Sequence, residues 1–422
     1  MSGVVTFSDL KNAHPAQWQA AAEDWLSLSK HALQAAEDIR ANGSRPLQEN
    51  WTDAVGREAA ADLKDVADRL EAGGDVMRGI TMVLDGLASS MEYAQRTLRH
   101  ALDLAEAYDI DVDENGNTST RGEGVTSEKL THLNDVSDLI KEALRQAREA
   151  DALAEPELRT LMGKTYESDP SKALDEAQTA ASHTQMNILS AAIPDGSDPQ
   201  VVRDWWAGLS AKEQRELMRA EPVRIANLDG IPESVKLDLR GRDGKYDRVK
   251  QVQWALDHWD DTSIDKLDNN CTNFASESLK QGGVREKPDS GWGPGWSDDS
   301  WGRDDDADSG WWDERTDYSK SWGAAENLQN FMLQNGGHEV PVSEAMPGDL
   351  IFYEQAGDNE HIEKGNTHHA AVVTAVTPDG DVKYTQHTSS RQNVSLDGRL
   401  HATEKAEGEQ RVRVVRVSPS WY

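Results

Sequence analysis

The stretch DNNCTNFASESLKQGG, residues 268–283, decides the fold of the C-terminal part of the chain. Residues from Cys271 to Lys280 predict a helix, because apolar side chains recur at helical spacing and the Gly282–Gly283 pair can end it. Cys271 then lies in the first turn, where unpaired backbone N–H groups favour a thiolate. A lone cysteine on an apolar helical face is equally consistent with an inert core residue. The local sequence leaves both interpretations open.

Three later stretches predict strands of an antiparallel sheet. MPGDLIFY (346–353) is a turn that enters a strand, THHAAVVT (367–374) enters a second strand, and VKYTQHT (382–388) returns as a third. A helix bearing a cysteine, followed by a sheet bearing a histidine and another polar residue, is the chain order of papain-like thiol hydrolases. This order favours the interpretation of Cys271 as a nucleophile.

The same segments resemble the putative amidase domain family, whose members are relatives of NlpC/P60 cysteine peptidases. The resemblance covers about 245–420 and is carried by 268–283, SWGAAENLQNFMLQNGG (321–337), MPGDLIFYE (346–354), HHAAVVTAV (368–376) and YTQHT (384–388). It implies a papain-like α+β domain with an antiparallel sheet over residues 243–422. It implies no cofactor.

The resemblance also implies a catalytic site of the Cys-His-His type. Cys271 would be the nucleophile, His369 its general base, and His387 the third group, which holds the imidazole in orientation. Because side chains alternate along a strand, Gln386 and His387 cannot both serve. The alternative for His387 is a surface histidine at a strand end.

Stabilisation of an oxyanion would come first from the backbone N–H of Cys271, because helix N-termini favour developing negative charge. Asn270 and Asn273 are the candidates for a supporting donor.

An insert at 285–320 is rich in tryptophan, glycine and aspartate. Indoles beside carboxylates could line a groove for a sugar, an amide-rich polymer or a cationic peptide. The alternative is a long loop whose indoles cover the core. The candidates for such a groove are Trp292, Trp296, Trp301 and Trp322. The acidic residues show no ligand spacing, so we expect no metal site.

The first half of the chain predicts long amphipathic helices. Helices at 15–40 and from about 52 to 106 would form a hairpin, with a break at ANGSRPLQEN (41–50). Residues 1–106 resemble the WXG100-like (ESX-type) hairpins of type VII secretion substrates, through Trp51 and Gly56 at the turn.

Two further segments complete the predicted organisation. Residues 107–196 would hold a hairpin turn and further helices, and the DIDVDENG run at 109–116 favours an Asn-Gly hairpin over a calcium loop. Residues 197–242 would be a helical linker module around Trp205 and Trp206. The expected fold class is therefore multidomain α and α+β.

Composition narrows the function. The chain has 44 Lys+Arg against 76 Asp+Glu, a net charge of -32, which disfavours nucleic-acid partners. We find neither a membrane span nor a cleavable signal peptide. One cysteine excludes an intramolecular disulfide.

We therefore expect a cysteine amidase or peptidase that works through a thioester acyl-enzyme on a cell-wall peptide or a protein. We expect it to be secreted as an effector or toxin by a type VII-like route; a cytoplasmic location is the alternative. Expected partners are a peptide or peptidoglycan substrate, secretion machinery, a chaperone hairpin or an immunity protein. The alternative function is a non-catalytic binding module of papain-like fold, presented by a helical scaffold.

Overall fold

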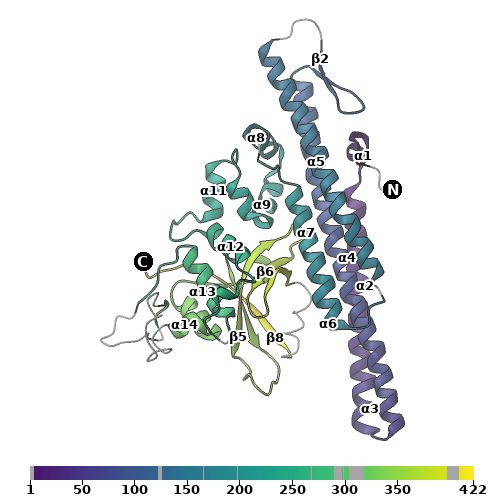
Figure 1. Ribbon diagram of the computed structural model, residues 1–422, viewed down its shortest axis with the longest axis vertical. Coiled ribbons are helices and arrows are strands. Elements are labelled where there is room, and N and C mark those ends of the chain that lie inside the picture. Colours follow the sequence, from purple (N-terminus) through teal and green to yellow (C-terminus); the bar gives the residue numbers. More distant parts are fainter. Residues whose placement is uncertain are drawn as a thin grey trace. The chain divides into compact units, whose positions relative to one another are not determined.

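The computed structural model describes residues 4–121, 126–164, 166–196, 198–267, 269–288, 297, 299–303, 318–396 and 408–422. The chain divides into two compact units, 1–214 with 228–230, and 215–227 with 231–422. The first is helical and the second combines helices with an antiparallel sheet (Figure 1), which confirms the predicted α and α+β class. The boundary falls within α9 (Ala211–Ala220), so residues 197–242 are shared by both units and are not a module of their own.

The first unit is built around one very long helix, α4 (Ala54–Ala107). The helix α2 (Pro15–Ile39) packs along α4, and so do α5 (Ser127–Gly163) and α7 (Thr179–Ala191). The hairpin and the helices after it therefore belong to one unit, although the sequence suggested a division at residue 106. Its shorter elements are α1 (Phe7–Asn12), α3 (Arg45–Asn50), α6 (Pro170–Lys172), α8 (Pro199–Gly208) and two π-helical segments (Arg40–Ser44 and Ala173–Gln178).

The turn of the long hairpin lies at residues 51–53, and the predicted break at 41–50 is wrong. A π-helical segment and α3 keep residues 40–50 helical, because Pro46 stands in the first turn of α3, where its missing N–H is not needed. Trp51 follows at the tip, and a Cβ atom at Gly56 would collide with its carbonyl oxygen. Asp53 caps α4 by accepting a hydrogen bond from the Gly56 N–H at 2.9 Å.

A small β-hairpin lies between α4 and α5. Its strands β1 (Ile110–Val112) and β2 (Thr118–Thr120) are antiparallel. At the turn the Asp113 carboxylate accepts hydrogen bonds from the N–H groups of Asn115 and Asn117, at 2.8 and 2.9 Å. Asp113 is thus a turn residue. In the described parts of the chain, no group of three or more His, Cys, Asp or Glu side chains is arranged to hold a metal.

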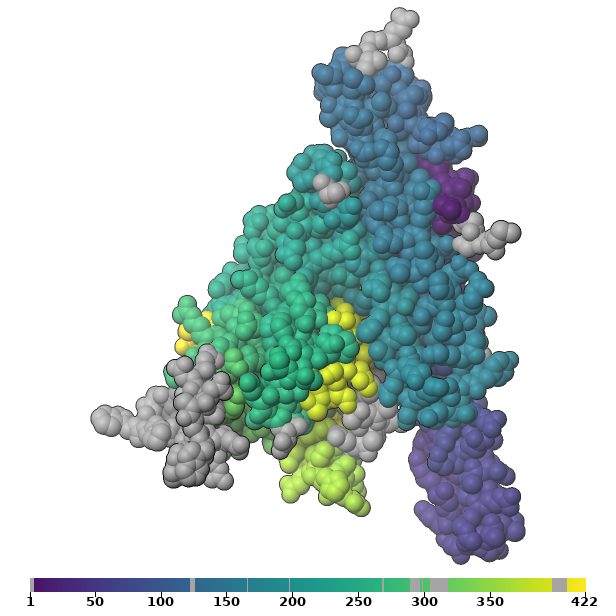
Figure 2. Space-filling model, in the orientation of Figure 1, coloured from purple at the N-terminus to yellow at the C-terminus, as the bar shows by residue number. Residues whose placement is uncertain are grey.

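The second unit contains one six-stranded antiparallel sheet in the order β3-β8-β4-β5-β6-β7. The β4–β5 connection, residues 356–366, is largely at the surface (Figure 2). The strands are β3 (His338–Val340), β4 (Leu350–Gln355), β5 (Thr367–Val376), β6 (Val382–Gln386), β7 (Arg391–Ser395) and β8 (Gln410–Arg416). The helices are α10 (Pro222–Asn227), α11 (Glu233–Arg240), α12 (Arg248–Asp257), α13 (Cys271–Gln281), α14 (Lys320–Gly323) and α15 (Ala325–Gln334), with 3-10 turns at Thr262–Ile264 and Val342–Glu344.

The core between α13 and the sheet contains two of the expected groove tryptophans. Trp301 and Trp322 are fully buried and stacked, with ring centroids 5.0 Å apart. The Trp301 indole donates to Ser276 Oγ at 3.2 Å, and the Trp322 indole donates to Asn273 Oδ1 at 2.8 Å. The groove prediction is wrong for these two residues, because their indoles fill the core beside α13. Trp292 and Trp296 lie outside the described residues.

None of the helices within the described ranges is both long enough and apolar enough to cross a membrane.

Candidate active site

The N-terminus of α13 positions the only cysteine of the chain. Cys271 is the first residue of this helix, and its side chain is free of any disulfide and only 2 % exposed. The helix packs against β5 and α12, because Phe274, Ala275 and Leu279 form one buried face. The core contacts of α13 therefore fix the position of the Cys271 sulfur beside the first residues of β5.

Cys271 and His369 are brought together by the packing of α13 on β5. The imidazole of His369 hydrogen-bonds to the thiol, and the N–H of Ala370 donates to the sulfur. The Thr272 hydroxyl oxygen lies 3.7 Å from the sulfur, and either group can be the donor in that contact. Burial would raise the pKa of the Cys271 thiol, but the charge and hydrogen bond of His369, with the two smaller contacts, outweigh it. The pKa of Cys271 therefore lies below its ordinary value, which favours the nucleophilic thiolate.

A third residue, Gln386 at the end of β6, holds the imidazole. His369 Nε2 lies 2.8 Å from Gln386 Oε1, and Gln386 Nε2 donates to the carbonyl oxygen of Ser389 at 3.0 Å. Because Ser389 takes the amide N–H, the amide oxygen faces the ring and Nε2 of His369 must carry the proton. Nδ1 is then the nitrogen left to face the thiol. The ring of Tyr353 lies tilted against the imidazole, with ring centroids 5.4 Å apart, and confines it further.

His387 does not contact His369, and the prediction that it orients the imidazole is wrong. Its Nδ1 lies 2.8 Å from the carbonyl oxygen of Trp259, and its Nε2 lies 2.7 Å from Asp265 Oδ1. The pairing of β6 with β7 shifts register between Tyr384 and Gln386, and such an irregularity changes which residue faces a given side. His387 therefore braces the segment before α13, a buried structural role.

The predicted oxyanion supports, Asn270 and Asn273, have structural partners instead. Asn270 Oδ1 accepts from the N–H groups of Lys266 and Leu267 at 3.0 and 3.1 Å, and its amide donates to the Leu267 carbonyl. Asn273 donates to the carbonyl oxygen of Ile264 at 2.9 Å. Both side chains thus bind the segment before α13, residues 264–267, to the start of this helix. The side-chain amide of each residue already donates to a backbone carbonyl oxygen, so neither arrangement supports the predicted role as an oxyanion donor.

The backbone N–H of Cys271 remains the candidate oxyanion donor at the start of the helix. It lies 3.4 Å from Asn269 Oδ1, at the long limit of a hydrogen bond. A stronger acceptor such as an alkoxide could displace this contact.

The neighbouring histidine, His368, belongs to a different contact. Its Nε2 lies 2.6 Å from Gln410 Oε1 on β8. The site therefore unites Cys271, His369 and Gln386. Strand alternation allowed only one of Gln386 and His387 to face the imidazole, and the family resemblance favoured His387. The register shift in β6, which leaves no sign in the local sequence, places Gln386 there instead.

Comparison with known proteins matches part of the second unit to a protein family. Residues 245–410 match the model of the family described as "Putative amidase domain". The chain is 31% identical over 144 residues to an uncharacterised protein of Bacillus subtilis (strain 168), YhbB; the alignment covers 32% of this chain and 39% of YhbB. No solved structure matches the chain. The family match supports an amidase-type hydrolase.

Proposed function

We propose that the second unit is a cysteine amidase or peptidase that cleaves an amide bond through a thioester acyl-enzyme. One observation carries the proposal: a buried thiol of lowered pKa contacts an imidazole whose other nitrogen is held by a glutamine. A nucleophile that contacts a base, with the base oriented by a third group, is the arrangement that activates a weak nucleophile. The match to the putative amidase domain supports the same reaction class.

In the first half of the reaction, Cys271 Sγ attacks the carbonyl carbon of the scissile amide. Nδ1 of His369 takes the thiol proton, while Gln386 accepts a hydrogen bond from Nε2–H and stabilises the imidazolium. The carbonyl oxygen becomes an oxyanion next to the Cys271 N–H. Collapse of this intermediate breaks the C–N bond, and His369 returns the proton to the leaving amine.

In the second half, a water molecule loses a proton to His369 and attacks the thioester carbonyl. The C–S bond breaks, the acyl group leaves as a carboxylic acid, and Cys271 takes back its proton. The resemblance to NlpC/P60 relatives supports cell-wall peptide amides as substrates, and a protein amide is the other candidate.

The reaction is tested with a panel of peptidoglycan fragments and peptides whose products are identified by mass spectrometry. We expect wild type to release products, and Cys271→Ser and His369→Ala to lose most of that activity. His368→Ala is the matched control, because His368 is the adjacent histidine on β5 and contacts Gln410. Equal rates for wild type and Cys271→Ser would refute the proposal and leave a non-catalytic binding module.

We also propose that the helical unit delivers this enzyme as a secreted effector or toxin, through a type VII-like machine, a chaperone hairpin or both. An immunity protein would then protect the producing cell. Support comes from the long α2–α4 hairpin with Trp51 at its turn, 45 % exposed.

Deletion of residues 1–106 would remove nearly all of α4, against which α5 and α7 pack, and would therefore disrupt the whole helical unit. A point variant is therefore the sharper test of delivery. In a strain with the native machinery, Trp51→Ala should leave less protein in the medium than Leu28→Ala, a change at a side chain of similar exposure on α2. Equal export of both variants would exclude a role for the Trp51 turn.

A further inference from the structure

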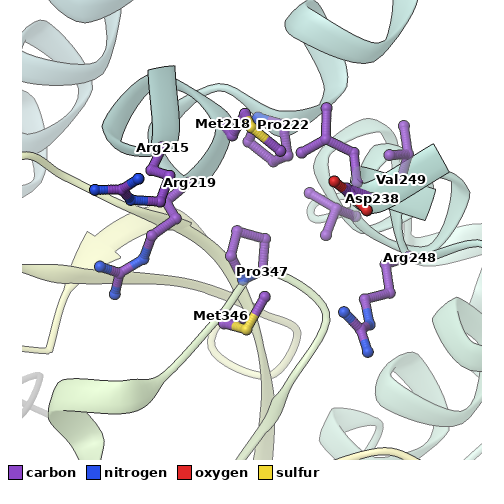
Figure 3. Close-up of a pocket in the computed structure, with 11 residues that line it drawn as sticks. Arg215, Met218, Arg219, Pro222, Asp238, Arg248, Val249, Met346 and Pro347 are labelled. Atoms are coloured by element: carbon purple, nitrogen blue, oxygen red, sulfur yellow. The ribbon is translucent and has the colours of Figure 1, made fainter. Parts of the chain in front are cut away.

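A cavity lies in the sheet-bearing unit and shares no residue with the Cys271 site. Its volume is about 210 Å³. It is formed between α9, α10, α11 and α12 and the turn that enters β4 (Figure 3). The family match covers α12 and this turn but not α9 to α11. The cavity is therefore completed by helices that lie outside the matched residues.

Apolar side chains form most of its wall. They come from α9, α10, α11, α12 and the turn, and include Met218, Pro222, Leu239, Val249, Val252 and Pro347. Cavities that hold drug-sized ligands usually measure ~300–1,000 Å³. A cavity of about 210 Å³ suits one compact apolar group, such as a branched alkyl chain or a phenyl ring.

Three arginines contribute to the lining. Arg215 and Arg219 extend from α9 to one side, and Arg248 lies at the other side (Figure 3). The carboxylate in the lining, Asp238, is already paired with Arg242 at 2.8 Å. No salt bridge joins any of these three arginines to a carboxylate within the described part of the chain. In a chain of net charge -32, such a cluster is an unusual local concentration of positive charge.

Arg219 lacks an acceptor for part of its guanidinium group. Its Nη2 donates to the carbonyl oxygen of Ala345 at 3.1 Å, but its buried Nε has no hydrogen-bond partner. Burial lowers the pKa of Arg219 below its ordinary value. The charge of Glu216 raises it in part, and the like charge of Arg416 lowers it further. Arg215 stands one helical turn away, where a like charge is unfavourable. An anion beside the two guanidinium groups would relieve both repulsions.

We propose that this cavity binds a small carboxylate with a compact apolar body, its carboxylate held by Arg215 and Arg219 and its apolar group enclosed between Met218 and Val252. The ligand can be a free organic acid or the C-terminal residue of a peptide, since both present a carboxylate beside an apolar group. The site is a binding site separate from the proposed hydrolysis and does not depend on it.

Isothermal titration calorimetry on the full-length protein tests this binding with matched probes. The probes are 4-methylpentanoate and phenylacetate for a free acid, N-acetyl-leucine for a peptide C-terminus, and 4-methylpentanamide as the neutral control. We expect at least one carboxylate to bind, and the amide to bind roughly tenfold more weakly or worse, because a hydrogen bond to a charged group is lost. Preference for N-acetyl-leucine over the free acids identifies the peptide end as the source.

Variants test the position of the carboxylate. Arg219→Gln and the exposed Arg215→Gln should each raise Kd roughly tenfold or more. Arg411→Gln is the control, because it removes the same charge from the 60 % exposed side chain on β8. Circular dichroism establishes whether each variant folds. If Arg219→Gln does not fold, Arg215→Gln alone decides the test. Three results would each overturn the proposal: equal affinity for acid and amide, equal affinity of Arg215→Gln and Arg411→Gln, or no binding of any probe at millimolar concentration.

Discussion

Replacing Gln386 by leucine tests which residue holds the imidazole of His369. Leucine fills a similar volume but cannot accept the hydrogen bond that Nε2 of His369 makes to Gln386 Oε1 at 2.8 Å. The Gln386 side chain is 1 % exposed, so water cannot readily replace the lost partner. The ring is then free to turn, and its Nδ1 no longer faces the thiol in the productive orientation.

The expected size of the effect follows from the cost of an unpaired buried donor. Leaving such a group without a partner costs about 1–3 kcal/mol. If this cost falls on the productive arrangement, the rate of thiol chemistry drops roughly 5- to 150-fold, at ~1.36 kcal/mol for each factor of ten. We expect Gln386→Leu to fall in this range.

Alkylation of Cys271 by iodoacetamide measures this effect without knowledge of the substrate. The labelling rate of the folded protein is followed by intact mass at several pH values, with thermal unfolding as a check on folding. Gln410→Leu is the matched control, because Gln410 makes the corresponding contact to His368 Nε2 at 2.6 Å. If Gln386→Leu labels as fast as wild type, or if Gln410→Leu slows labelling equally, Gln386 does not position the base.

Three further predictions concern the thiol, the buried indoles and the hairpin turn. Because the pKa of Cys271 is lowered from 9.0, iodoacetamide should still label Cys271 below pH 9.0. In His369→Ala the effect of burial dominates and the pKa of Cys271 rises, so labelling near pH 6 should fall more than tenfold. Trp322→Ala should lower the free energy of unfolding by about 3–5 kcal/mol, measured by urea denaturation, and a change in substrate affinity without loss of stability would contradict the core position. Gly56→Ala should lower the melting temperature of the protein, because its Cβ collides with the carbonyl of Trp51, and an unchanged melting temperature would show that the turn can relax.

Much of the catalytic framework could be predicted from local sequence. The helix starting at Cys271 and the strand bearing His369 have strong local signals: a glycine stop and a run of small and β-branched residues. That this helix and this strand would lie together was predicted from the chain order of papain-like hydrolases. The pairing of β8 with β3 and β4 could not be predicted, because its partners lie far away in the sequence, although the alternating valines of Gln410–Arg416 are typical of a strand.

The errors have physical causes in tertiary packing. Gln386 and His387 are adjacent polar residues, and only the register of β6 decides which one faces His369. Trp322 could equally have lined a groove, because an indole needs an enclosed apolar surface in either position. Its burial beside Trp301 depends on how residues 299–303 return to α13, which no local pattern contains.

The most direct test of the central claim is detection of the acyl-enzyme itself. A substrate that wild type cleaves is mixed with the enzyme, quenched in acid within the first turnover, and the intact protein mass is measured. We predict a mass increase equal to the acyl portion of the substrate, localised to Cys271 by peptide mapping, released by hydroxylamine, and absent from Cys271→Ala. Cleavage by wild type without any adduct, together with undiminished cleavage by Cys271→Ala, would contradict nucleophilic catalysis by this thiol.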